Sequence, residues 1–336
     1  MNDGRNQTAK RPSVFWRVIV PAVAMLLVSG LVILYGHRVF DYFAARSFTP
    51  SGEIAAIHDS LKLTSRGSDL LYASEPQLEN AKDFNQSCSS TERTVAILGC
   101  YYMRKIYIFD ISNPELAGAK EVTAAHEMLH AAYERLNYFE RQRVDTLLEE
   151  EYSQLHDNAQ LKKLMEYYQK AEPNSLANEL HSLLGTTVAT LSPELERYYE
   201  QYFGDRQHIV AVNKAYNTVF ETVEARSQEL AGLIRNLETK IETDKNAYLS
   251  DLDTLKRDIE AFKQRAASGY YRSNAVYQNA INALNARIAD MESRRALINQ
   301  DVSRLNDYIE EQNKLSVRVN ELNNSINGIS EGGVSL

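Results

Sequence analysis

Hydrophobic and polar positions divide the chain into three segments with different patterns. Residues 18–36 (VIVPAVAMLLVSGLVILYG) contain no charged residue, and a helix of that length measures about 28 Å, close to the hydrocarbon core of a bilayer. We therefore predict a single transmembrane helix over residues 18–36. A cleaved signal peptide is the alternative, but Tyr35, Arg38 and Phe40 occupy positions where a cleavage site has small residues.

The distribution of basic residues predicts the orientation of this helix. Cytoplasmic flanks carry the excess of Lys and Arg, and more basic residues precede the segment than follow it closely. Those before it are Arg5, Lys10, Arg11 and Arg17, and those after it are Arg38 and Arg46. Residues 1–17 are thus predicted to be a cytoplasmic tail, and everything after the membrane to be extracellular or periplasmic.

Residues 209–327 have a helical pattern with almost no Gly or Pro. Apolar residues recur at alternating spacings of three and four from Leu230 to Phe262, and again from Tyr277 to Ile309. The reversal between the two runs is predicted at residues 267–270, which include Gly269. This pattern predicts a long antiparallel coiled-coil hairpin of about 75–80 Å, followed by a flexible tail at 328–336. One continuous parallel dimeric coil is the alternative, and Gly269 disfavours it.

Residues 37–208 mix helical and extended patterns. β-Branched and aromatic residues at 94–98 and 105–111 predict two strands that pair antiparallel. Helical patterns cover 141–155, 161–169 and 176–184, and a further helix is predicted with Ser192 as its N-cap and Pro193 at its first position. The predicted fold class is α+β: a transmembrane helix, a mostly helical domain with a small antiparallel sheet, and the coiled-coil hairpin.

Charge and cysteine content narrow the classes of partner and site. The chain has 336 residues and a formal net charge of −8, which argues against a nucleic-acid partner. Its two cysteines, Cys88 and Cys100, both lie in the predicted exported part. Their spacing suits a disulfide that closes a small loop in an oxidising environment. Two free buried thiols are the alternative. A cysteine zinc site is disfavoured because no CxxC spacing occurs.

The sequence His126-Glu127-Met128-Leu129-His130 predicts a metal site. Residues four apart lie on one face of a helix, so His126 and His130 can offer two imidazoles to one ion. Glu127 is placed to take a proton from a metal-bound water. Catalytic zinc uses three protein ligands and a water, so a third ligand has to come from another part of the chain.

Glu179 is the candidate third ligand, within the pair Asn178-Glu179 of a predicted helix. With the HExxH motif, this pair resembles the gluzincin metallopeptidases, the thermolysin clan, over roughly residues 105–208. The resemblance implies that His126, His130 and Glu179 bind zinc and that Glu127 is the general base. It also implies that a strand edge beside the active helix receives substrate, for which 106–111 is the candidate. The clan has an Asp four residues after the ligand Glu, where this chain has Leu183.

Other polar residues are weaker candidates for the site. His181 is the rival third ligand, but it points about 200° away from Glu179 around the helix, so both cannot easily bind one ion. It could instead reach the substrate, hydrogen-bond to one of the ligands, or be a structural histidine. Arg206 and His208 are candidates for holding an oxyanion.

The predicted function is therefore a membrane-anchored zinc metallopeptidase that acts on a protein or peptide substrate outside the cytoplasm. The coiled coil is predicted to position this domain, limit access to it, or bind a partner or a second copy of the chain. Two alternatives stay open at this stage. One is a non-catalytic cell-envelope scaffold that works through its coiled coil, and the other is a zinc amidase that acts on cell-wall peptides.

Overall fold

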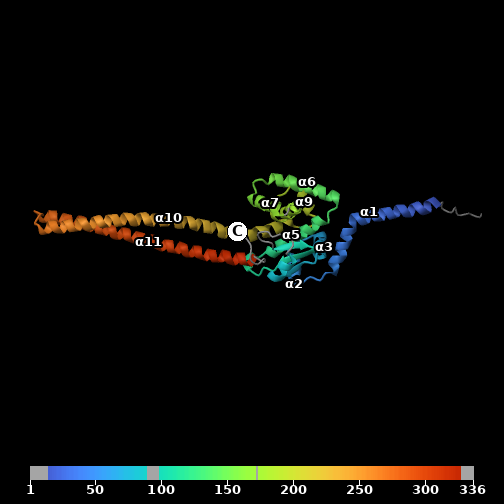
Figure 1. Cartoon of the computed structure of the whole chain (residues 1–336), viewed down its shortest axis with the longest axis horizontal. Helices are drawn as coiled ribbons and strands as arrows, with labels where there is room; N and C mark the ends of the chain where they lie inside the picture. Colours follow the sequence, from blue (N-terminus) through green and yellow to red (C-terminus); the bar gives the residue numbers. More distant parts are fainter. Residues whose placement is uncertain (1–13, 89–97, 172, 327–336) are drawn as a thin grey trace, which may run out of the picture. The chain divides into compact units, whose positions relative to one another are not determined.

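The computed structural model describes residues 14–88, 98–171 and 173–326 (Figure 1). The helices and strands in chain order are α1 (Val14–Ser47), α2 (Gly52–Ser60), α3 (Ser65–Ala73), β1 (Gln77–Glu79), α4 (Ala81–Ser87), β2 (Gly99–Tyr102), β3 (Lys105–Phe109), the 3-10 helix η1 (Pro114–Leu116), α5 (Ala119–Glu134), α6 (Tyr138–Gln154), α7 (Ala159–Ala171), α8 (Leu176–Thr187), α9 (Pro193–Tyr199), α10 (Arg206–Ala267) and α11 (Asn274–Ile326). They form two compact units. Of the described residues, those up to Asn217 and those from Asn324 onwards belong to the N-terminal unit, and Thr218–Asn323 form the hairpin unit.

Helix α5 is at the centre of the N-terminal unit. Its apolar residues Ala124, Ala125, Met128 and Leu129 are completely buried. The helix contacts strands β2 and β3 as well as helices α2, α3 and α8 (Figure 1). Because α5 is covered on several sides, its polar residues Thr123, Glu127 and His130 are buried.

Helix α8 packs closely against α5 because residue 185 is a glycine. A Cβ atom at Gly185 would lie 2.4 Å from Cδ1 of Leu129 and 2.9 Å from Cε1 of Tyr199, closer than real side-chain contacts allow. Leu180, Leu183 and Leu184 are buried on the same helix at spacings of three and four, which place them on one face. The small residue and this apolar face together fix α8 beside α5.

The small sheet is mixed, whereas the prediction was an antiparallel pair. Its strand order is β1-β3-β2. Strand β1 runs parallel to β3, with Leu78 opposite Ile108, and β2 runs antiparallel to β3, with Cys100 opposite Tyr107. Strand β3 is therefore central, so the prediction of 106–111 as the edge strand is wrong. Among the described residues, the edge nearest α5 is formed by β2.

The predicted α+β class and its transmembrane helix are both corrected. The structure is 79% helical, with twelve helices among the described residues, so it belongs to the mainly helical class. None of these helices has the length and apolarity needed to cross a membrane, so the predicted span at 18–36 is wrong. That segment belongs to the longer helix α1, which continues through charged residues such as Arg38 and Asp41 to Ser47.

The C-terminal part of α1 is attached to the N-terminal unit by packing and by charge. It packs against α3. The single Nε–H of Arg135 donates a bifurcated hydrogen bond to the two carboxylate oxygens of Asp41, at 2.9 and 2.8 Å, and both residues are buried. Arg135 also donates to the hydroxyl of Tyr101 on β2, at 3.1 Å. One buried guanidinium thus connects α1, the end of α5 and the edge strand.

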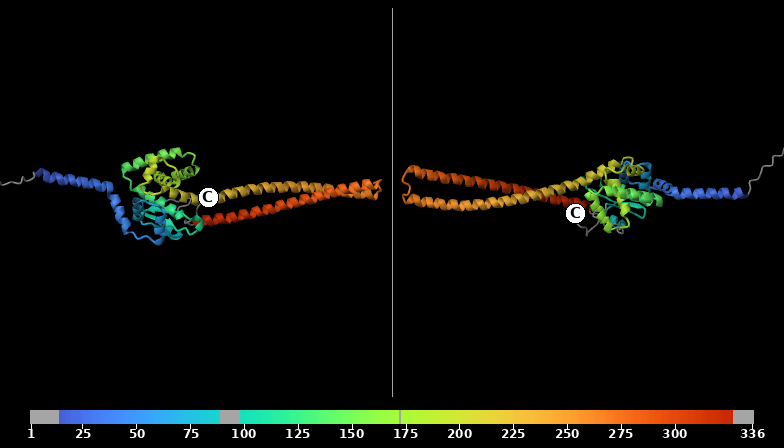
Figure 2. Two further views of the ribbon diagram at one scale, coloured as in Figure 1. Left: turned by 180° about the vertical axis from the view of Figure 1, so that it is seen from behind. Right: turned by 90° about the horizontal axis from the view of Figure 1, so that it is seen from above.

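In the hairpin unit, α10 and α11 run antiparallel, side by side in both views of Figure 2. Ion pairs cross between the helices along their length, and their members approach one another in sequence towards the turn. These pairs are Arg226–Glu311, Lys240–Asp301, Arg294–Asp251 and Arg287–Asp258. At the turn, the rings of Phe262, Tyr271 and Tyr277 lie 5.4–5.6 Å apart. Gly269 has a φ of 71°, a left-handed conformation that suits glycine.

Some predicted elements lie outside the described residues. These are most of the first predicted strand (94–97), the predicted tail at 328–336, and residues 1–13 of the predicted cytoplasmic tail.

Candidate metal centre

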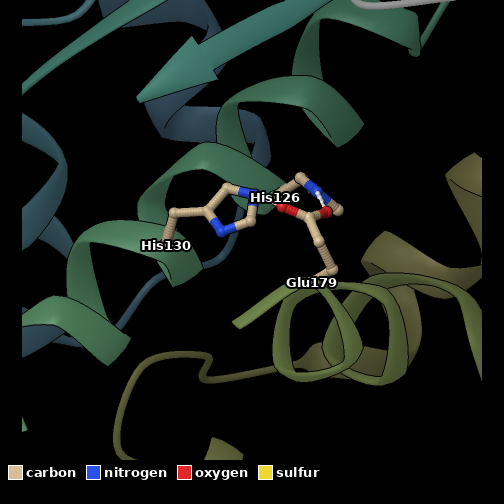
Figure 3. A group of neighbouring side chains, drawn as sticks. All are labelled: His126, His130 and Glu179. Atoms are coloured by element: carbon tan, nitrogen blue, oxygen red, sulfur yellow. Dashed lines mark ion pairs between the residues drawn. The ribbon is translucent and has the colours of Figure 1, made fainter. Parts of the chain in front are cut away.

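Two helices bring three metal-binding side chains together. His126 and His130 lie one turn apart on α5, with ring centroids 4.7 Å apart, and Glu179 comes from the first turn of α8. Figure 3 shows the two imidazoles and the carboxylate converging on one another. One donor atom from each residue lies within 4.8 Å of the other two. Glu179 and His130 are buried, and His126 is partly exposed.

The spacing of these donors suits a tetrahedral ion. Zinc bonds of about 2.0–2.2 Å at tetrahedral angles separate neighbouring ligand atoms by about 3.3–3.5 Å. Nε2 of His130 lies 3.5 Å from Oε1 of Glu179, and Nε2 of His126 lies 3.7 Å from Oε2. Each imidazole therefore faces a different oxygen of one carboxylate, at a separation close to that between two ligands of one ion. These residues fit a zinc ion by number, by chemistry and by spacing.

Burial and the neighbouring charges shift the pKa values of His126 and Glu127 in opposite directions. Burial by itself lowers the pKa of His126, but the hydrogen bond to Glu179 and the charges of Glu127 and Glu179 raise it above its usual value. Burial raises the pKa of Glu127 and is the largest contribution, followed by the opposing charges of His130 and His126. Glu127 is only 5% exposed. Bulk water therefore does not compete for its carboxylate. Its interactions with His126, His130 and Glu179 show that it lies beside the candidate ligands.

His130 is supported by a serine from the same helix that carries Glu179. The hydroxyl of Ser182 lies 3.2 Å from Nδ1 of His130, so a hydrogen bond leaves Nε2 free to face Glu179. Gluzincins place an Asp at the position of Leu183, but here Leu183 belongs to the apolar core. Ser182 is not among the site residues predicted from the sequence. It lies three residues after Glu179, and that spacing places the two on one helix face.

His181, the rival third ligand, lies outside the cluster. Its Nε2 is 2.8 Å from the hydroxyl of Tyr198, and the rings of Tyr133, Tyr198 and Tyr199 surround it. Burial, followed by the charges of His130 and His126, lowers the pKa of His181 to about 3. Its ring is therefore neutral at physiological pH. In this arrangement His181 is a structural histidine.

No known protein family, curated protein or solved structure matches the chain. The chemistry of the cluster therefore has to be inferred from this chain alone.

The two weak oxyanion candidates are also away from the cluster. The guanidinium of Arg206 is buried and donates to the carboxylate of Glu196 and to the carbonyl of Val188, at 2.8 and 2.7 Å. Arg206 thus attaches the start of α10 to α8 and α9. His208 is partly exposed, and its peptide N–H donates to the carboxylate of Asp205.

Strand β2 is the part of the site that the sequence analysis did not predict. Cys100 of this strand forms a disulfide with Cys88 at the end of α4. Its neighbour Gly99 lies directly against Glu127. An isolated glycine inside a strand pattern often marks a close approach of the backbone, so Gly99 was the signal available in the sequence.

Proposed function

We propose that this chain is a zinc-dependent hydrolase that cuts peptide bonds. His126, His130 and Glu179 are the proposed zinc ligands, and Glu127 is the proposed general base. The observation that carries the proposal is the convergence of these three side chains from two helices, with a second carboxylate, the buried Glu127, beside them. The resemblance of the HExxH and Asn-Glu motifs to those of gluzincin metallopeptidases also supports this proposal.

The proposed chemistry assigns one task to each residue. When bound, zinc lowers the pKa of its water towards neutrality and polarises the scissile carbonyl. Glu127 accepts the proton of this water and passes it to the leaving amine. Ser182 holds the ring of His130 in the orientation that ligation needs.

The presence of Glu127 favours hydrolysis over other uses of the same ligands. Two histidines and one carboxylate also bind ferrous iron in oxygenases. A carboxylate beside the ligands can accept the proton of a metal-bound water, and Glu127 interacts with all three candidate ligands. The disulfide between Cys88 and Cys100 favours a location of this domain in an oxidising compartment outside the cytoplasm.

Metal analysis of the purified full-length chain is the first test of this proposal. The protein is purified without chelators, and its zinc and iron are measured by elemental analysis. The variants are His126→Ala, Glu179→Ala and Glu127→Gln. His156→Ala is the matched control, because that histidine is 75% exposed and lies outside the cluster. We expect about one zinc per chain in wild type, in Glu127→Gln and in the control, and loss or weakening of zinc in the two ligand variants.

Hydrolysis is measured next, on a mixed peptide library and on cell-wall muropeptides. Glu127→Gln is expected to lower kcat about 10²- to 10⁴-fold while zinc is retained, because only the proton acceptor is removed. Cleavage of muropeptides but not of linear peptides would assign the amidase reaction instead. A folded wild-type protein that binds no zinc would refute the enzyme, and the hairpin would then be the functional part of the chain.

A further inference from the structure

The backbone of β2 packs against the side chain of Glu127 with no space for another atom at Gly99. A Cβ at Gly99 would lie 2.9 Å from Cγ of Glu127, 3.0 Å from its Oε1, and 2.4 Å from Cγ2 of Thr123. The backbone of Gly99 has no left-handed φ, so conformation does not require glycine at this position. The requirement is for space between the strand and α5.

The hydrogen-bonding pattern of the sheet shows which backbone groups of β2 face outward. The peptide N–H of Phe109 donates to the carbonyl of Leu98, at 2.7 Å, and Gly99 lies opposite Ile108. Paired residues in an antiparallel ladder alternate between bonded and non-bonded positions. The backbone groups of Gly99 and Tyr101 therefore point away from β3. In agreement with this, the backbone of Tyr101 donates a hydrogen bond to Glu127, which opposes part of the rise in pKa that burial causes.

The disulfide holds the strand at the residue between these two. Strand β2 has only four residues and pairs with β3 along one edge. Cys100 is 2% exposed and is bonded to Cys88 at the end of α4. The strand is thus fixed on one side by pairing with β3 and through its side chain by α4, while its outward-facing groups contact Glu127.

We propose that β2 is the element that positions the general base, and that Gly99 is a positioning residue for Glu127. Glutamate has several rotamers, and only some of them bring its carboxylate to the water on the metal. The Gly99 backbone excludes rotamers that would enter the strand. This inference rests on the proposed function, because the position of Glu127 matters for turnover only if Glu127 is the base.

The test uses Gly99→Ala together with a variant that removes one of its two obstacles. Thr123→Ser deletes Cγ2 and keeps the hydroxyl that donates to the carbonyl of Ala119. In the double variant Gly99→Ala/Thr123→Ser, the side chain of Glu127 is therefore the nearest obstacle that the added methyl group still meets. We expect Thr123→Ser to match wild type, and the double variant to lose about 10- to 100-fold in kcat with KM within a few-fold and zinc unchanged. Recovery of wild-type kcat in the double variant would overturn the proposal.

Hydrogen exchange tests the same contact without any activity. Exchange of the peptide amides in β2 is measured by mass spectrometry on the metal-free full-length chain, for wild type and for Glu127→Ala. We expect faster exchange at Gly99–Tyr102 in Glu127→Ala, because the carboxylate bonded to Tyr101 is gone. If zinc and hydrolysis are absent, the proposed function fails while this measurement still reports the contact. If the enzyme is active and exchange is unchanged, the positioning role alone fails.

Discussion

Replacing Asp41 by alanine should strongly destabilise the N-terminal unit. The carboxylate of Asp41 accepts a bifurcated hydrogen bond from Nε–H of Arg135, and the two side chains are only 6% and 4% exposed. Removing one partner of a buried pair leaves the other charge without compensation, which costs about 3–5 kcal/mol. A unit of this size loses about 2–4 °C of Tm per kcal/mol, so we expect a decrease of about 6–20 °C.

The matched control is a second ion pair made by the same helix. Arg46 of α1 pairs with Asp69 of α3 at 3.3 Å, but the side chains are 53% and 29% exposed. Exposed pairs contribute about 0.2–1 kcal/mol, so Asp69→Ala should change Tm by only a few degrees. Urea unfolding followed by near-UV circular dichroism gives the free energy of unfolding for each variant. Equal decreases in the free energy of unfolding for Asp41→Ala and Asp69→Ala would refute the reasoning from burial.

Two further predictions concern α8. Ser182→Ala removes the hydrogen bond to His130, so zinc affinity measured by competition with a chelator should fall about 10- to 100-fold; unchanged affinity would contradict the supporting role of Ser182. The pKa of His181 is lowered to about 3 in the folded protein, below its usual value of about 6.5. At a pH between these two pKa values, His181 binds a proton in the unfolded chain but not in the folded protein. The free energy of unfolding therefore decreases as the pH falls. In urea titrations, wild type should lose about 1.4 kcal/mol per pH unit below pH 6 relative to His181→Phe, and parallel pH curves would exclude this account.

The pair of histidines in the candidate site could be predicted from the local sequence alone. The third ligand, Glu179, comes from a distant part of the chain and could be predicted only by resemblance. His126 and His130 are four residues apart on a helix, so one helical turn brings them together without any knowledge of the fold. Glu179 lies on another helix, and no periodicity distinguishes it from the other acidic residues of the chain. It entered the sequence analysis through the resemblance to gluzincins. In the structure, Gly185 and the apolar face of α8 bring it to α5.

The incorrect predictions come from features that depend on distant parts of the chain. The apolar pattern at 106–111 indicates a strand but does not show which neighbours it has, and β1 makes β3 central by adding to its other edge. The uncharged stretch at 18–36 was treated as a complete element, whereas α1 extends to Ser47. The contact between Asp41 and Arg135 joins residues 94 positions apart, and local patterns carry no information about such a pair.

The antiparallel arrangement of α10 and α11 also determines how the hairpin unit should respond to force. The ion pairs from Arg226–Glu311 to Arg287–Asp258 are successive layers that end at the aromatic cluster of Phe262, Tyr271 and Tyr277. A force that pulls the helices apart at the end opposite the turn loads one layer at a time. A force that slides one helix along the axis of the other loads all of these layers together. The hairpin is therefore weaker to opening from its base than to sliding of its helices, and the aromatic cluster is the last layer to separate and the first to re-form.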